Sequence, residues 1–136
     1  MASVAEMRGR LTNGSLLRSD VLIDGKWTGA ASGATIDVTD PFTGKLVGTI
    51  PSLSDAEVRG AVAAAEAAFP KWSRELNRHR GALLRRWWEL VIEHQEDLAR
   101  LITLENGKPL KEARAEIGYG AQFIEFSPKM RPASSA

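Results

Sequence analysis

The sequence predicts an α/β protein in which β-hairpins are followed by three helices. Three observations lead to this prediction. Apolar and polar residues alternate in short runs within residues 21–50, and turn residues separate the runs. A helix-capping signature follows at residue 54, and from there apolar residues recur at helical spacing as far as residue 124. The length of 136 residues allows one domain.

The strands are predicted first. Val21–Ile23 and Lys26–Thr28 flank the pair Asp24-Gly25, which tolerates the positive φ angles of a tight type I′ turn, so this segment predicts a β-hairpin. Thr35–Thr39 alternates apolar and polar residues, and Leu46–Ile50 follows the turn residues Thr43-Gly44. These two runs predict a second strand pair, which Pro51 ends.

The first helix is predicted to begin after Ser54. Ser54 and Glu57 have the spacing of a capping box, in which each side chain accepts a hydrogen bond from the other residue's backbone amide. The following stripe comprises Val58, Val62, Ala65 and Phe69. Pro70 cannot donate the next helical hydrogen bond, so the helix is expected to end there.

A second, longer helix is expected from Arg78 to Leu104, and Asn106-Gly107 supplies its stop. Its apolar face is broad and comprises Leu84, Trp87, Trp88, Val91, Leu98, Leu101 and Ile102. Pro109 suits the first turn of a third helix, whose stripe is Leu110, Ala113, Ile117, Ala121 and Ile124. Gly118 and Gly120 interrupt this helix, which predicts a crowded neighbour beside them.

Composition excludes several kinds of protein. The chain carries 18 Lys and Arg against 17 Asp and Glu, so it has no general field that attracts nucleic acid or an anionic membrane. It contains no cysteine, which excludes disulfides, thiolate metal sites and a cysteine nucleophile. Neither a membrane span nor a signal-peptide core is visible. We therefore expect a cytoplasmic protein with no nucleic-acid and no membrane partner.

Two local patterns are candidates for a site. The stretch Arg78–Trp88 combines arginines with two tryptophans, as in proteins that bind phosphates and stack bases, but acidic residues follow directly and favour a solvated helix with one buried face. His79 and His94 have no acidic or hydroxyl partner at a recognised motif spacing. Neither a nucleophile elbow nor a glycine-rich phosphate loop is present. These patterns name no catalytic and no cofactor-binding residue.

Five segments between residues 20 and 126 share their order and motifs with a known family. They are VLIDGKW (21–27), IDVTDPFTGKLVGTIP (36–51), AAAEAAFPKWS (63–73), EHQEDLARLITLENGKPLKEARAEI (93–117) and QFIEF (122–126). In this order they resemble the N-terminal region of the aldehyde dehydrogenase superfamily, most closely its succinate-semialdehyde dehydrogenase branch. The run Leu104–Leu110 is the most specific of these motifs.

The resemblance implies an enzyme that oxidises an aldehyde, such as succinate semialdehyde, to a carboxylate with NAD or NADP. In the family a cysteine thiolate attacks the aldehyde, hydride passes to the nicotinamide and a glutamate activates water. These groups lie later in the family's sequence, as does most of its Rossmann-type sheet. The chain therefore resembles the N-terminal part of the cofactor domain, and alone it is expected to bind no cofactor and to be inactive.

The resemblance also implies site residues. Tyr119 and Ala115 match positions that line the family's substrate tunnel, although Tyr119 is equally well interpreted as a packing residue. The backbone carbonyls of Val38 and Thr39 and the carboxylate of Glu105 match ligands of a structural monovalent-cation site, whose remaining ligand belongs to the missing part. Hard oxygen ligands suit such an ion. The alternative for Glu105 is a local cap or ion pair.

The predicted organisation has three parts: a flexible N-terminal arm (1–20), a partial aldehyde dehydrogenase region (21–126) and an aberrant tail (127–136). The tail departs from the family pattern, and a one-base frameshift explains it because the shifted frame can encode a continuation of that pattern. A truncation or a fusion joint is the alternative. A different function is a stand-alone helical module that binds a full-length paralogue, or associates with itself, through exposed apolar helix faces.

Overall fold

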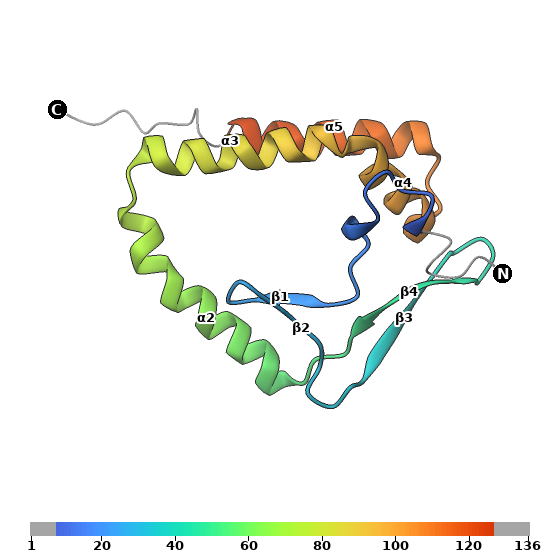
Figure 1. Cartoon of the computed structure of the whole chain (residues 1–136), viewed down its shortest axis with the longest axis horizontal. Coiled ribbons are helices and arrows are strands. Elements are labelled where there is room, and N and C mark those ends of the chain that lie inside the picture. Colours follow the sequence, from blue (N-terminus) through green and yellow to red (C-terminus); the bar gives the residue numbers. More distant parts are fainter. Residues whose placement is uncertain (1–7, 127–136) are drawn as a thin grey trace.

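The computed structural model describes residues 8–126 and contains two small antiparallel sheets and four α-helices within this range (Figure 1). The order is η1 (Gly14–Leu16), β1 (Val21–Ile23), β2 (Lys26–Thr28), β3 (Thr35–Thr39), β4 (Leu46–Pro51), α2 (Asp55–Arg74), α3 (Asn77–Glu93), α4 (Gln95–Asn106) and α5 (Leu110–Phe126). The expected hairpins followed by helices are confirmed. The predicted tail, 127–136, lies outside the described residues.

Both strand pairs form as the turn chemistry predicts. Asp24 and Gly25 have φ angles of 49° and 72°, the left-handed values of a type I′ turn, and Ile23 pairs with Lys26 across it. In the β3–β4 turn the Asp40 carboxylate accepts the amides of Phe42 at 2.8 Å and Thr43 at 3.2 Å. The bond from the Phe42 amide is the main reason that the pKa of Asp40 is lowered.

The start of α2 has the predicted capping box. Ser54 Oγ accepts the Glu57 amide, and Glu57 Oε2 accepts the Ser54 amide at 2.7 Å. Glu57 Oε1 also accepts the amide of Ala31 at 2.7 Å, which ties the connection between the two hairpins to α2. The expected end at Pro70 is wrong, because α2 continues to Arg74. Pro70 lies on an exposed turn of the helix. Because Pro70 has no N–H, the backbone carbonyl four residues earlier lacks its helical hydrogen bond, and water can hydrate that carbonyl instead.

The expected single helix from Arg78 to Leu104 is divided into α3 and α4. His94 ends α3 and caps α4 with φ −101° and ψ 15°, a conformation outside the helix. No proline or glycine stands at the break, so local propensity does not cause it. Contacts of α4 with α5 and with the N-terminal residues set its separate direction.

The helices pack as α3 and α5 side by side, with α4 against α5 (Figure 1). Ala99, Ala113 and Ala121 are buried in these contacts. The predicted crowding at two glycines of α5 is wrong: a Cβ on Gly118 would meet Gln95 Nε2 at an ordinary 3.6 Å, and one on Gly120 would meet nothing within 4 Å. Glycine costs helix stability at these two positions, and no steric crowding within the described residues explains why it is present.

The small hydrophobic core joins the N-terminal residues to β4 and α4. Leu11, Leu17 and Val47 are buried together, and partly buried Val38, Leu101 and Leu104 pack against them. The described part of the predicted arm, residues 8–20, is therefore packed rather than loose. Arg18 also lies over the ring of Trp27, 4.6 Å from its centre. Among the described helices, none is long and apolar enough to cross a membrane.

Candidate functional site

The residues predicted as cation ligands lie where β3, β4 and the C-terminal end of α4 meet. A cavity of about 20 Å³ is lined there by Val38, by residues 47–50 of β4, by residues 17–19 and by Glu105. Thr39 is not among the lining residues. The structure therefore brings two of the three predicted residues, Val38 and Glu105, to one small cavity although they are far apart in the sequence.

The backbone beside this cavity is irregular. Val38 pairs with Gly48 but Thr39 pairs with Leu46, so Val47 is an extra residue in β4 and forms a β-bulge. A bulge locally disrupts the hydrogen-bond ladder and turns backbone groups away from it. The irregularity falls between the two residues whose carbonyls were predicted to face a cation.

The residues present fit a small, hard cation. A cavity of about 10–15 Å³ is enough for one water molecule, so this cavity can hold one water-sized ion. Carbonyl and carboxylate oxygens are the appropriate donors. Within residues 8–126 no three His, Asp or Glu side chains gather as a metal cluster. Any ion here would therefore depend on backbone carbonyls and on Glu105, whose side chain is exposed.

The predicted tunnel residues lie on α5 and face solvent. Ala115 and Tyr119 are one helical turn apart and both are exposed, Tyr119 by 63%. The Tyr119 ring meets the ring of Phe123 edge to face, with centroids 5.0 Å apart. Within the described residues the side chain of Tyr119 is therefore exposed apart from its contact with Phe123, and both interpretations of this residue, as a tunnel wall and as a packing residue, stay predictions.

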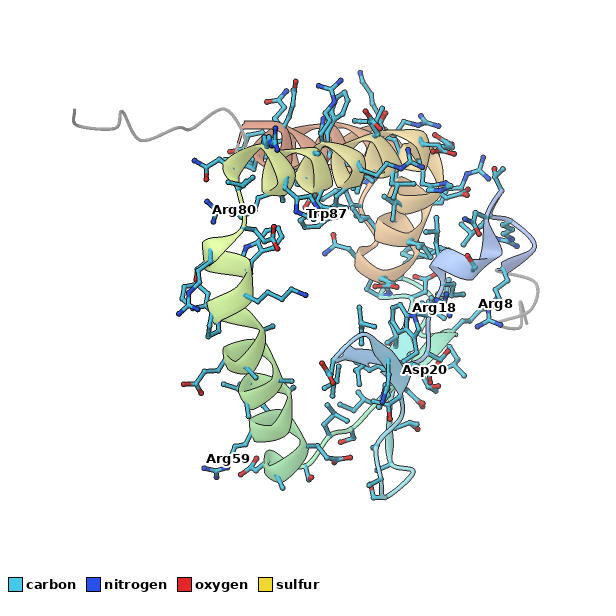
Figure 2. All side chains as sticks on the ribbon, turned by 60° about the vertical axis from the view of Figure 1, so that its left-hand side comes forward. Arg8, Arg18, Asp20, Arg59, Arg80 and Trp87 are labelled. Carbon is cyan, nitrogen blue, oxygen red and sulfur yellow. The ribbon has the colours of Figure 1, made fainter. Side chains whose placement is uncertain are left out.

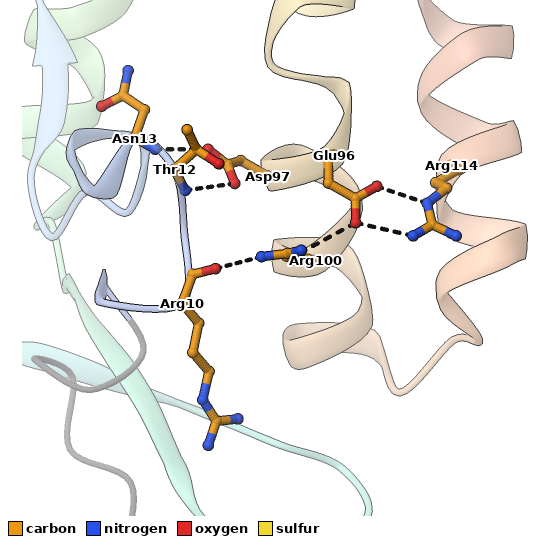
Figure 3. Close-up of polar contacts among 7 residues, drawn as sticks. All are labelled: Arg10, Thr12, Asn13, Glu96, Asp97, Arg100 and Arg114. Carbon is orange, nitrogen blue, oxygen red and sulfur yellow. Dashed lines mark hydrogen bonds and ion pairs between the residues drawn. The ribbon is translucent and has the colours of Figure 1, made fainter.

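A network of polar side chains on α4 was not predicted from the sequence. Asp97 of α4 is 2% exposed, and its carboxylate accepts the amide of Thr12 at 2.9 Å and that of Asn13 at 2.7 Å (Figure 3). Burial by itself raises the pKa of this carboxyl, but the two amides and the positive charges of Arg100 and His94 bring it below its ordinary value. A charged carboxylate thus holds the N-terminal residues on α4.

A second acid extends this network to α5. Arg114 donates two hydrogen bonds to Glu96, from Nε at 2.7 Å and from Nη2 at 2.9 Å, and Arg100 donates a third at 3.3 Å (Figure 3). These bonds, first those from Arg114, lower the pKa of Glu96 to about 2. Arg100 also donates to the carbonyl of Arg10 at 2.5 Å. The network is structural, because it joins three segments and leaves no reactive group open.

The histidine and arginine patterns are helix-surface contacts. His79 Nδ1 lies 2.8 Å from the carboxylate of Glu75, four residues earlier, and both side chains are at least partly exposed, so this is a helix-surface pair of the kind expected for a surface histidine. Arg85 lies over the Trp88 ring at 4.4 Å and pairs with Glu89 at 3.3 Å. These side chains therefore pair with neighbouring side chains on the surface of α2 and α3.

Comparison with known proteins gives consistent results. The model of the aldehyde dehydrogenase family matches residues 27–134. Glutarate-semialdehyde dehydrogenase of Pseudomonas putida is 50% identical over 117 residues, which are 86% of this chain and 24% of that protein. Succinate-semialdehyde dehydrogenase [NADP(+)] of Escherichia coli is 46% identical over 117 residues, again 86% of this chain and 24% of the relative.

Solved structures show the same fold. The crystal structure of an E. coli NADP-dependent enzyme superposes with a TM-score of 0.86 at 42% identity and covers 93% of this chain and 28% of its own. Succinate-semialdehyde dehydrogenase from Burkholderia pseudomallei superposes with a TM-score of 0.85 at 45% identity and covers 88% and 25%, respectively. The chain thus spans about a quarter of the length of the curated relatives it matches.

Proposed function

The chain belongs to the aldehyde dehydrogenase family, and from this premise we propose that it is a scaffold segment of an NAD(P)-dependent enzyme that oxidises a semialdehyde to the dicarboxylate. The semialdehyde class rests on the names of the relatives, which are glutarate-semialdehyde and succinate-semialdehyde dehydrogenases. Both substrates carry a carboxylate at the end opposite the aldehyde. The whole reaction requires groups that this chain does not contain.

The chain by itself is proposed to be inactive. The observation that carries this proposal is the absence of any cysteine in the 136 residues, because the chemistry of the family needs a thiolate nucleophile. The described residues also do not fit the NAD(P) cofactor. The connection from β4 to α2, Ser52–Ser54, is the one described passage from a strand into a helix, and it has no glycine to admit a phosphate. No step through the cofactor is therefore assigned to this chain.

Within the whole enzyme we assign two supporting roles to residues of this chain. The exposed face of α5 that carries Ala115 and Tyr119 forms a wall of the substrate tunnel. The carbonyls of Val38 and Thr39 and the carboxylate of Glu105 contribute to a monovalent-cation site, for which the cavity beside Val38 and Glu105 has the right size. The cation would attract oxygen atoms from both β3 and the end of α4, and so hold the β3–β4 pair against that helix.

The proposal is tested by an assay of the purified chain. Succinate semialdehyde and glutarate semialdehyde are each incubated with the chain and with NAD or NADP, and absorbance at the reduced-nicotinamide wavelength is followed. The E. coli relative serves as the positive control. We expect no reduction above the background without protein, and any turnover that depends on the chain would refute the claim of inactivity.

A second candidate function is a helical module that binds a full-length paralogue. The observation in its favour is the exposure of large apolar side chains on α2, α3 and α5, which is typical of interaction surfaces. A thermal melt distinguishes the helical module from the scaffold segment. A soluble, monodisperse chain that unfolds cooperatively favours the module, whereas a scaffold segment without its partner is expected to melt broadly or to aggregate.

A further inference from the structure

A cavity of about 160 Å³ lies where the N-terminal residues, the last two turns of α4 and the first residue of α5 meet. It is open to solvent on one side. Its lining comprises Arg10, Leu11, Arg100, Thr103, Leu104 and Leu110. None of these residues belongs to the proposed tunnel wall or to the proposed cation site, so the cavity is a separate feature of the chain.

The walls of this cavity are mostly apolar and continue the small hydrophobic core. Leu11 is 8% exposed and belongs to that core, and the partly buried Leu104 packs against it. Leu110 adds a third leucine from α5. In another protein, an engineered cavity of roughly 150 Å³ lined by Leu, Ile and Phe stays free of water and binds benzene. The present cavity therefore has the size and the lining to accept one six-membered carbon ring.

One buried polar atom of a lining residue has no partner. The Oγ1 atom of Thr103 is buried and forms no hydrogen bond within residues 8–126. A threonine inside a helix often donates its hydroxyl to the backbone carbonyl four residues earlier, but Thr103 does not. A hydroxyl that is buried without a partner costs free energy. A ligand that offers a hydrogen-bonding group to Thr103 recovers that cost.

Arg10 supplies a positive charge beside these apolar walls. Arg100 is already engaged, because its Nε donates to Glu96 at 3.3 Å and its Nη1 donates to the backbone carbonyl of Arg10 at 2.5 Å. The guanidinium of Arg10 is exposed, and within residues 8–126 it forms no hydrogen bond and no ion pair. Figure 3 shows it reaching away from Arg100. Because a planar guanidinium can donate two parallel hydrogen bonds to a carboxylate, the cavity favours a ligand that carries one.

We propose that this cavity binds a small aromatic carboxylate with a ring hydroxyl, of which 4-hydroxybenzoate is the simplest. The ring lies against Leu11, Leu104 and Leu110. The ring hydroxyl forms a hydrogen bond with Thr103 Oγ1, and the carboxylate pairs with the guanidinium of Arg10. This binding site goes beyond the proposed function, because semialdehyde oxidation assigns no role to any of these residues.

Three other occupants fit the cavity less well. A bound water needs two to four polar partners, whereas half of the six lining residues are leucines. A purely apolar molecule such as benzene leaves both Thr103 and Arg10 without a partner. Inorganic phosphate can pair with Arg10, but it places a multiply charged group against leucine side chains, where it loses hydration.

The test compares three probes on the purified 136-residue chain. They are 4-hydroxybenzoate, benzoate, which lacks the hydroxyl, and phenol, which lacks the carboxylate. Amide shifts in two-dimensional NMR spectra locate each probe and give its Kd. From the usual ligand efficiency of small molecules we expect a Kd of about 1 mM for 4-hydroxybenzoate, with the largest shifts at Leu11, Thr103 and Leu104. Benzoate and phenol should each bind about fivefold more weakly.

Two variants assign the polar contacts. Thr103→Val keeps the shape of the side chain and removes the hydroxyl, so it should weaken 4-hydroxybenzoate about fivefold and leave benzoate unchanged. Arg10→Gln removes the charge, so it should weaken both carboxylates and leave phenol unchanged. The matched control is Arg59→Gln, which removes the same charge from an exposed position near the start of α2, away from α4 (Figure 2). It should bind all three probes like the unchanged chain.

The comparison of the three probes needs no variant, so it decides the inference even if a variant does not fold. No shift at the lining residues with 4-hydroxybenzoate at about 10 mM, ten times the expected Kd, would overturn the inference. Equal affinity for the three probes, or shifts centred on Tyr119 rather than on Leu11 and Leu104, would overturn it as well. An equal loss of affinity in Arg10→Gln and Arg59→Gln would attribute the effect to net charge and contradict the pairing with Arg10. The assay of semialdehyde oxidation is independent of each of these outcomes.

Discussion

The buried carboxylate of Asp97 allows a prediction whose magnitude follows from two hydrogen bonds. In Asp97→Asn one oxygen becomes an amide NH₂, which cannot accept a hydrogen bond, so either Thr12 or Asn13 loses its partner in a site that is 2% exposed. A hydrogen bond to a charged group contributes about 1.5–3 kcal/mol, and leaving the donor unpaired adds a desolvation cost. We expect the contact between the N-terminal residues and α4 to weaken by about 3 kcal/mol.

Amide hydrogen exchange measured by NMR reports this contact directly. A loss of about 3 kcal/mol corresponds to exchange about a hundredfold faster at Thr12 and Asn13, provided that opening is faster than chemical exchange. Trypsin should also cleave faster after Arg10, whose carbonyl is held by Arg100. The control is Asp55→Asn, which removes the same charge from an exposed position at the start of α2.

Unchanged exchange at Thr12 and Asn13 in the Asp97→Asn variant would refute the reasoning, because the amides would then be protected by something other than the carboxylate. An equal acceleration in Asp55→Asn would refute it as well, since the effect would follow net charge rather than the two bonds. The exchange of amides in the β3–β4 ladder should stay the same in both variants.

Three further predictions concern stability. Gly107→Ala should destabilise the chain in urea unfolding by about 1–3 kcal/mol, because Gly107 has φ +78° and a Cβ there would lie 2.9 Å from Pro41 Cγ, and a neutral result would contradict both arguments. Val47→Ala removes about two methylene equivalents from the core and should cost about 2 kcal/mol in the same assay; no change would mean that the core does not hold β4. The pKa of Glu96 in the folded state is lowered to about 2, below the ordinary pKa of a glutamate. Its pair with Arg114 should therefore stabilise the fold fully above that ordinary pKa and be lost as the pH falls toward 2. A titration of the Glu96 carboxylate followed by its NMR shift can show this.

What the sequence predicts well in this chain is local. The turn at Asp24-Gly25 and the capping box of Ser54 and Glu57 are decided by residues within three positions of one another, and both form as expected. The division of the long helix at His94 is not local. It depends on contacts of α4 with α5 and with residues 12 and 13, which are more than eighty positions away in sequence from Asp97.

A sequence signal for the Asp97 site does exist. Asp97 stands four and seven residues before Leu101 and Leu104, on the same face of the helix as these apolar residues. A carboxylate in an apolar stripe needs hydrogen-bond donors when it is buried. The pattern identifies the acid, but it does not identify Thr12 and Asn13, because backbone amides carry no side-chain signature.

The same distinction explains why α2 forms but is not packed. Its cap, its apolar stripe and its acidic first turn all lie within the helix, and they are sufficient to specify a helix in the sequence. Amphipathic helices in proteins gain most of their stability from the burial of the apolar face, however, and α2 buries none of its residues. Residues 8–126 provide no surface that buries this stripe. We therefore expect α2 to be the least protected helix of the isolated chain in hydrogen exchange, and to become protected when a polypeptide that covers Val62 and Phe69 is added.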